Sequence, residues 1–274
     1  MLWALGFVSL YPPPQVDMGA VELPLVDHPE DARRLYVEWE GRTWFLDTGY
    51  AVTTCDDDYV DDAGLERRKT LSWSKGTGGY ARLEKTRLPA FDWGEAHVGE
   101  LKCAVRDLGS TSSIPDDVAG VLGMNLLGRW IIEVDLVDEV LRLHDPAGWT
   151  AEGLDVRREF GTWRLKVPVT TLADERWALL DTGATSTWVK ASRLGLAHNG
   201  SDEVPVTGTG GTRVVAVDYY AAEGLTIGGL DPEGLQIVRQ KPGRKELVGM
   251  DLLGRYDCFW MDVRDPRFGT CTAL

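Results

Sequence analysis

The 274-residue sequence lacks the short motifs on which several enzyme chemistries depend. Neither G-x-S-x-G, H-E-x-x-H nor G-x-x-x-x-G-K-[ST] occurs, which argues against a serine hydrolase, a zinc peptidase and a P-loop nucleotide hydrolase. Histidine is scarce, and the histidines are scattered along the chain without the spacing of metal ligands: His28, His97, His144 and His198. We therefore expect neither a metal ion nor another cofactor.

Cysteine is also scarce, with two residues in each half of the chain and no C-x-x-C spacing: Cys55, Cys103, Cys258 and Cys271. This pattern indicates neither a structural zinc site nor a thioredoxin-type pair. Two alternatives stay open, namely a disulfide within each half and buried free thiols. The compartment is therefore not fixed by the cysteines, and the localisation stays unknown.

Long apolar runs and positive charge are missing too. The stretch "LWALGFVSL" is nine residues long and no basic residue precedes Arg33, so we expect neither a membrane span nor a secretory signal, and a soluble chain. Lysine and arginine number 29 against 43 acidic residues, a net charge of -14. Binding to a phosphate backbone is unfavourable at this charge, so we expect no nucleic-acid partner.

What the sequence does contain is an internal repeat. "FLDTGYAVTT" from Phe45 is answered by "LLDTGATSTW" from Leu179, so that Asp47-Thr48-Gly49 corresponds to Asp181-Thr182-Gly183. With 31 glycines and 13 prolines the composition favours many turns and an all-β protein. Upstream, we match Pro24 with Pro168, which predicts about ten extra residues in the first half, near "DHPEDARR".

Two further pairs of segments follow the Asp-Thr-Gly motifs. Gly-Thr-Gly-Gly begins 29 residues after Asp47 and 27 after Asp181, which predicts a glycine-tipped hairpin in each half. After the hairpin, each half has a segment of two apolar residues and a glycine, which we expect to form a core strand. The residues of these segments are Lys75, Gly76, Thr77, Gly78 and Gly79; Gly208, Thr209, Gly210 and Gly211; Val121-Leu122-Gly123; and Leu247-Val248-Gly249.

With these three motifs in each half, the sequence resembles the aspartic peptidases, the group of the pepsins and retropepsins. The resemblance implies an all-β, bilobal fold with pseudo-two-fold symmetry, an N-terminal lobe of residues 1–150 and a C-terminal lobe of residues 151–274, joined near "PAGWTAEG". We refer to these ranges as the first and second half. Because pepsins normally have one flap and retropepsins one per subunit of a homodimer, two hairpins suggest fused retropepsin-like lobes and an active site complete in a monomer.

The chemistry of peptide hydrolysis gives a reason for the duplication. Without a metal or a nucleophilic side chain, one group must take a proton from water while another gives one to the substrate carbonyl. Two carboxylates held close share a proton and do both, as in aspartic proteases. The resemblance implies that Asp47 and Asp181 form this dyad in the inter-lobe cleft and act on a peptide or protein substrate.

The resemblance also implies roles around the dyad. Gly49 and Gly183 allow the tight turns, and Thr48 and Thr182 would reach across the lobe interface to backbone groups. The hairpins of residues 75–79 and 208–211 would act as flaps that bind an extended substrate and exclude water.

The sequence departs from the family at two places. Lys75 stands where pepsins usually have a tyrosine. The residue after each Asp-Thr-Gly motif is Tyr50 or Ala184, and neither offers the small hydroxyl that pepsins have at this place. Without that hydroxyl we expect a weakly acidic rather than strongly acidic activity optimum. The departures keep open a catalytically silent member that binds peptides or proteins. A structural duplicated domain without a ligand would leave the paired hairpins unexplained.

Overall fold

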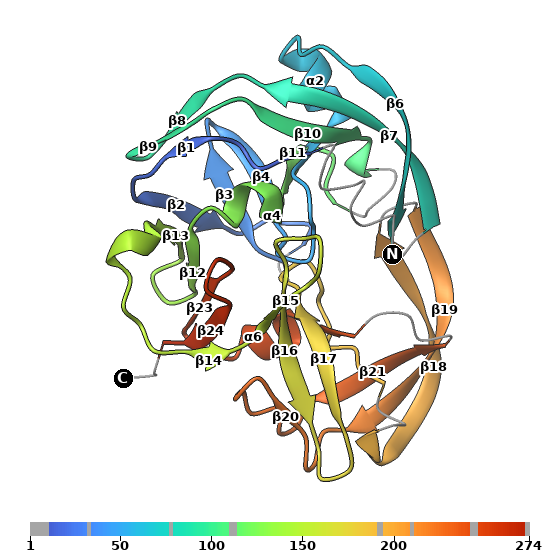
Figure 1. The fold of residues 1–274 in the computed structure, drawn as a ribbon. Helices are drawn as coiled ribbons and strands as arrows, with labels where there is room; N and C mark the ends of the chain where they lie inside the picture. Colours follow the sequence, from blue (N-terminus) through green and yellow to red (C-terminus); the bar gives the residue numbers. More distant parts are fainter. Residues whose placement is uncertain are drawn as a thin grey trace.

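The computed structural model describes residues 11–31, 34–76, 79–109, 114–190, 194–208, 211–241 and 246–271. The chain is mostly β, as the sequence predicts, with several sheets and a few short helices (Figure 1). No helix among these residues is long and apolar enough to cross a membrane.

Among its described residues, the first half forms strands β1 to β13 and several short helical segments. Their bounds are β1 (Val16–Asp17), β2 (Val21–Val26), β3 (Tyr36–Trp39), β4 (Arg42–Leu46), β5 (Thr54–Asp56), α2 (Asp57–Asp62), β6 (Arg68–Gly76), β7 (Gly79–Leu88), β8 (Phe91–Trp93), β9 (Ala96–Val98), β10 (Leu101–Arg106), β11 (Val118–Leu122), α4 (Met124–Leu127), β12 (Ile131–Asp135), β13 (Val140–His144) and the 3-10 helix η1 (Pro146–Gly148).

The second half follows a similar order. Its elements are β14 (Leu154–Asp155), β15 (Arg157–Arg158), β16 (Leu165–Thr170), β17 (Glu175–Leu180), β18 (His198–Gly208), β19 (Gly211–Ala221), β20 (Thr226–Ile227), β21 (Gln236–Lys241), β22 (Leu247–Val248), α6 (Met250–Leu253), β23 (Cys258–Asp262) and β24 (Arg267–Thr270).

In each half the second strand of a hairpin ends directly before the Asp-Thr-Gly motif. β3 and β4 are joined by a two-residue turn in which Glu40 and Gly41 both have positive φ, 53° and 67°, the conformation of a tight type I′ hairpin. β16 alternates buried Leu165, Val167 and Val169 with half-buried residues, the period of a strand with one face in the core. It pairs with β17, which ends just before Asp181.

The match of Pro24 with Pro168 is wrong, because it aligns strands with different partners. Tyr36 of β3 pairs with Phe45, two residues before Asp47, and Lys166 of β16 pairs with Leu179, two residues before Asp181. The counterpart of β16 is therefore β3, whereas β2 corresponds to β15.

The predicted ten-residue insertion in the first half is wrong for the same reason. Val26 pairs with Tyr36 ten residues later, and Arg157 pairs with Lys166 nine residues later. The two halves thus have loops of nearly equal length at this place.

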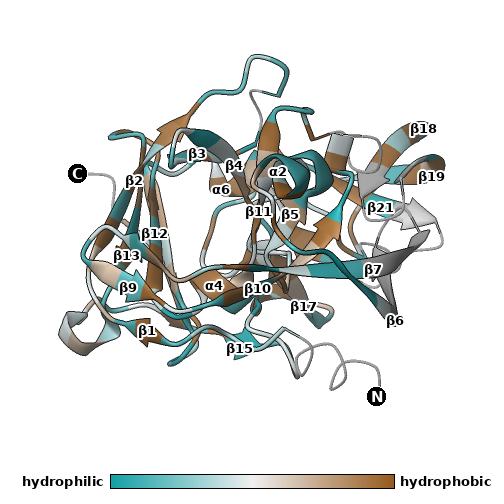
Figure 2. Ribbon diagram, turned by 90° about the horizontal axis from the view of Figure 1, so that it is seen from above, coloured by the Kyte–Doolittle hydropathy of each residue, from teal (hydrophilic) through white to brown (hydrophobic). Residues whose placement is uncertain are grey.

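One large sheet contains strands from both halves. β12 pairs antiparallel with β23 along five residues, so the strand order β24-β23-β12-β13 is continuous across the halves. A single cluster of buried apolar side chains also draws on both, including Leu122, Leu180 and Val248. All residues of β11 are buried, whereas Val60 is the buried residue of α2, a helix that Figure 2 shows largely in the teal of hydrophilic residues. This shared core fixes the two Asp-Thr-Gly segments relative to each other.

The two predicted glycine-tipped hairpins are present. Gly76 pairs with Gly79 at the end of β6 and β7, and Gly208 pairs with Gly211 at the end of β18 and β19. Thr77, Gly78, Thr209 and Gly210 lie outside the described residues. Figure 1 shows the two hairpins on the same side of the molecule, one from each half.

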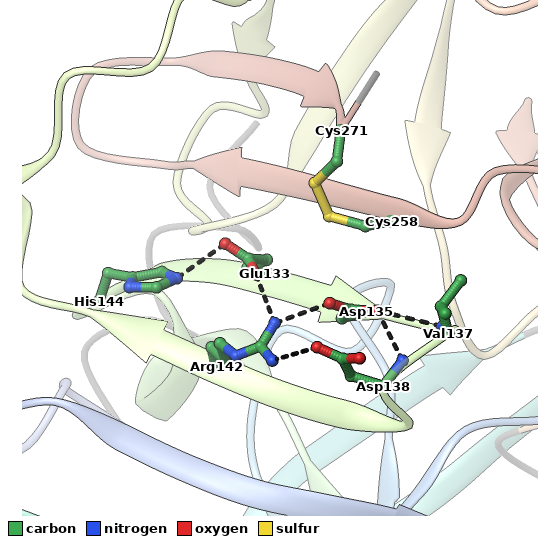
Figure 3. Close-up of a disulfide and its surroundings, with 8 residues drawn as sticks. All are labelled: Glu133, Asp135, Val137, Asp138, Arg142, His144, Cys258 and Cys271. Atoms are coloured by element: carbon green, nitrogen blue, oxygen red, sulfur yellow. Dashed lines mark hydrogen bonds and ion pairs between the residues drawn. A yellow bond between two sulfur atoms is a disulfide. The ribbon is translucent and has the colours of Figure 1, made fainter. Parts of the chain in front are cut away.

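The cysteines follow both of the alternatives that the sequence left open. Cys258, the first residue of β23, and Cys271, which follows β24, form a disulfide with Cα atoms 5.0 Å apart (Figure 3). Cys55 and Cys103 are buried free thiols, and burial raises the pKa of the Cys103 thiol well above its ordinary value. These two thiols therefore act as small apolar core residues.

A charged network lies on the large sheet near the disulfide (Figure 3). The Glu133 carboxylate accepts a hydrogen bond from Arg142 at 3.0 Å and contacts His144 Nε2 at 2.9 Å. Arg142 also donates to Asp135 and Asp138, both at 2.8 Å. The hydrogen bond with His144 is the largest cause that holds the pKa of Glu133 below its ordinary value of 4.5, and Arg142 adds to it.

We expect Glu133→Gln to lower the melting temperature in a pH-dependent way. A carboxylate whose pKa is lowered by folding stabilises the protein above its unfolded pKa, and this stabilisation is lost as the pH falls through the folded value. The difference between wild type and variant should be complete above pH 4.5 and shrink below it. Glu38→Gln, at an exposed position of β3, is the control. A difference that stays constant from pH 6 to pH 3 would contradict this account.

Candidate active site

The two Asp-Thr-Gly segments are held by the same backbone contacts in each half. Asp47 directly follows β4, and its N–H donates to Leu122 O at 3.3 Å. Asp181 directly follows β17, and its N–H donates to Val248 O at 3.0 Å. The apolar-apolar-Gly segments thus lie beside the aspartates, as the sequence predicts for β11 and β22.

Thr48 and Thr182 connect the halves through four buried hydrogen bonds. Thr48 N–H donates to Thr182 Oγ1 at 3.0 Å, and Thr182 N–H donates to Thr48 Oγ1 at 3.1 Å. The hydroxyl of Thr48 donates to Leu180 O at 3.1 Å, and that of Thr182 donates to Leu46 O at 2.8 Å. Each hydroxyl therefore accepts one hydrogen bond and donates another across the interface, which leaves little rotational freedom.

The glycines bring the two carboxylates together. A Cβ added to Gly49 would overlap the Asp181 carboxylate, and one added to Gly183 would overlap the Asp47 carboxylate. Each carboxylate thus lies against the backbone of the other half. Gly49 N–H also donates to Asp47 Oδ1 at 2.8 Å. Gly49 therefore contacts both carboxylates, that of Asp47 through this bond and that of Asp181 at its Cα. Asp47 is buried and Asp181 half-buried.

A second pair of supports was missed from the sequence. Gly123 N–H donates to Thr53 Oγ1 at 3.2 Å, and Thr53 N–H donates to Asn125 Oδ1 at 2.6 Å. The equivalent bonds of the second half join Gly249 to Thr187 at 3.1 Å and Thr187 to Asp251 at 2.8 Å. The signal was present in the repeat, because each threonine follows its aspartate by six residues.

The residues that follow each glycine occupy equivalent places, although their side chains differ. Tyr50 O and Ala184 O accept hydrogen bonds from Met124 N–H and Met250 N–H, both at 2.8 Å. The Tyr50 ring is half-buried and packs against the apolar cluster that contains Phe45. The turn therefore has the same backbone hydrogen bond in both halves, although one half has Tyr50 and the other Ala184.

A cavity of about 450 Å³ is lined by Thr185, two residues after the second Asp-Thr-Gly motif, but by no residue of either motif. First-half residues such as Arg34 and Tyr36 form one wall, and second-half residues Thr185 and Met250 form another. The lining combines a guanidinium group with apolar groups, hydroxyl groups and the acidic residues Asp27, Glu139 and Asp251. A space of this size fits a small ligand or a peptide side chain.

The described residues contain no cluster of three or more histidine, cysteine, aspartate or glutamate side chains placed to hold a metal ion. No protein-family model matches the chain, and no curated protein matches it either. The functional assignment therefore depends on the chemistry of the site itself.

We expect Thr182→Val to destabilise the protein by about 2–4 kcal/mol, because it leaves two buried backbone groups, Thr48 N–H and Leu46 O, without their partner. Thr182 is fully buried, so water cannot take the place of the lost hydroxyl. Urea unfolding measures the change. Thr226→Val, at an exposed position of β20, is the matched control. A Thr182→Val effect within 0.5 kcal/mol of this control, on the order of an ordinary surface substitution, would contradict the role of the interlock.

Proposed function

We propose that the protein is an aspartic endopeptidase of pepsin/retropepsin-like fold, in which Asp47 and Asp181 activate a water molecule in a cleft between two lobes. The observation that carries this proposal is the meeting of the two carboxylates, each against the other half's Asp-Thr-Gly glycine. Two carboxylates that close do not both ionise readily, so one proton is shared between them.

In the proposed reaction the two aspartates act as base and acid. The ionised carboxylate takes a proton from water, and the water oxygen bonds to the carbon of the scissile carbonyl. The protonated carboxylate gives its proton to the carbonyl oxygen, which forms a neutral tetrahedral diol. The carboxyl that took the water proton then gives it to the amide nitrogen, while the other carboxylate takes a proton from a diol hydroxyl. The C–N bond breaks, an acid and an amine leave, and the pair again shares one proton. No covalent enzyme intermediate is needed.

The surroundings of the dyad are compatible with a peptide or protein substrate. The long hairpins β6–β7 and β18–β19 lie on one side of the molecule, where strand-like backbone could pair with an extended peptide. The cavity beside Thr185 would take one substrate side chain. Because both aspartates come from one chain, we infer that a monomer is the active form.

We expect Asp47→Asn and Asp181→Asn each to abolish cleavage while the fold is kept, because an amide cannot take or give the shared proton. The assay is digestion of a denatured peptide library between pH 3 and pH 8, with mass spectrometry of the new termini. Asp62→Asn, an exposed carboxylate at the end of α2, is the matched control and should cleave like wild type. Full turnover by either dyad variant would refute the proposal.

The same assay separates the proposal from the alternative of a catalytically silent binding member. Peptide binding by wild type without any new termini, at every pH in the series, would favour the binding protein. Cleavage by wild type and by Asp62→Asn, together with its loss in both dyad variants, would favour the peptidase.

A further inference from the structure

A basic residue lies behind the first Asp-Thr-Gly segment, and it belongs to the other half of the chain. Arg164, just before β16, donates from Nη1 to the carbonyl oxygen of Gly49 at 2.8 Å. The sequence separation is 115 residues. The Arg164 side chain is largely buried, with 19% of its surface exposed. This contact thus connects the halves in addition to the threonine interlock and the β12–β23 pairing.

The acceptor of Arg164 is part of the turn that carries the dyad. The peptide group between Gly49 and Tyr50 is fixed at both ends, since its oxygen accepts from Arg164 and its N–H donates to Asp47 O at 3.1 Å. The preceding amide, Gly49 N–H, donates to Asp47 Oδ1. A shift of Gly49 would therefore change the position of both carboxylates, because Asp181 lies against its Cα.

Arg164 is itself held in place by an acidic partner. Its guanidinium forms an ion pair with Glu159, and Lys166 Nζ lies 3.0 Å from the other carboxylate oxygen. Burial opposes ionisation of Glu159, but Arg164 and Lys166 outweigh it and keep the pKa of this carboxyl below its ordinary value of 4.5. The guanidinium is therefore held by a charge-assisted pair while another of its nitrogens donates to Gly49.

The first half contains a similar arginine–acid pair. By the strand register, Arg34 is the counterpart of Arg164, and Arg34 Nη1 pairs with Asp31 at 2.7 Å. Tyr36, the counterpart of Lys166, donates its hydroxyl to that same carboxylate at 3.0 Å. Both halves thus place an arginine two residues before the corresponding strand position and pair it with an acid, which precedes the arginine by three residues in the first half and by five in the second. The repeat of this pair argues against an accidental surface ion pair.

We propose that Arg164, oriented by Glu159, is a positioning residue that holds the Gly49 turn and thereby sets the geometry of the Asp47/Asp181 pair. For its catalytic consequence this inference rests on the proposed function. Arg164 does not touch the reacting atoms, so its loss should affect the chemical step through the placement of the carboxylates.

The test compares Arg164→Met with Arg157→Met. Arg157 is a nearby exposed arginine whose guanidinium stacks over the Trp177 ring, 3.9 Å from its centroid. In steady-state assays with a cleaved library peptide, Arg164→Met should lower kcat by about tenfold to a hundredfold, with less than about a threefold change in KM. Arg164→Lys, which keeps the charge but not the fork of donors, should recover part of kcat. Glu159→Gln should lower kcat in the same direction by less.

A second readout does not depend on activity. Amide hydrogen exchange followed by NMR should show at least about tenfold faster exchange of Tyr50 N–H in Arg164→Met, with Ala184 N–H, its counterpart in the second half, unchanged. Arg157→Met should change neither amide. If Arg164→Met does not fold, the lysine and glutamine variants provide the same two measurements.

The outcomes separate the two proposals. If wild type cleaves peptides, Asp47→Asn abolishes cleavage, and Arg164→Met matches Arg157→Met in kcat within twofold, the positioning role is wrong and the peptidase stands. If wild type cleaves nothing, the peptidase proposal fails, and the Tyr50 exchange rate alone decides whether Arg164 holds the turn. An unchanged Tyr50 rate in Arg164→Met overturns the inference in either case.

Discussion

Thr48 and Thr182 each place a hydroxyl against the backbone of the other half, where both side chains are almost fully buried. At this depth a missing partner is not replaced by water, so each half keeps the other's turn in place. This constraint also fixes the positions of the Asp47 and Asp181 carboxylates, because each aspartate directly precedes one of these two threonines. The paired strands β12 and β23 and the common core support the same interface from further away.

The duplication thus brings two carboxylates together. Each half supplies one carboxylate and one glycine, and the glycine of one half makes room for the carboxylate of the other. One half alone would leave its aspartate beside an open backbone turn, with no second group to share a proton. The halves differ where strict symmetry is not needed, as with Tyr50 and Ala184 or with Asn125 and Asp251. Their backbone hydrogen bonds are nevertheless the same.

The sequence was sufficient for the parts of the molecule that repeat letter by letter. The Asp-Thr-Gly motifs, the glycine-tipped hairpins and the β11 and β22 segments could be found because glycine and aspartate are kept at both places. The correspondence between the strands that precede Asp47 and those that precede Asp181 could not be found from the sequence. Pro24 and Pro168 suggested a match that the strand pairing contradicts. Arg34 and Arg164 were missed for the same reason. Their equivalence becomes visible only when Tyr36 and Lys166 are known to face corresponding partners, and the Arg164 contact spans two distant segments.

The central claim is that the two aspartates together form the reacting centre. The most direct measurement is a crystal structure with a statine-type inhibitor, whose hydroxyl group mimics the tetrahedral diol. The account predicts that this hydroxyl lies within about 3.2 Å of a carboxylate oxygen of both Asp47 and Asp181, with the inhibitor backbone extended between the β6–β7 and β18–β19 hairpins. An inhibitor bound only in the cavity beside Thr185, or with its hydroxyl on one aspartate while the other contacts solvent, would contradict it.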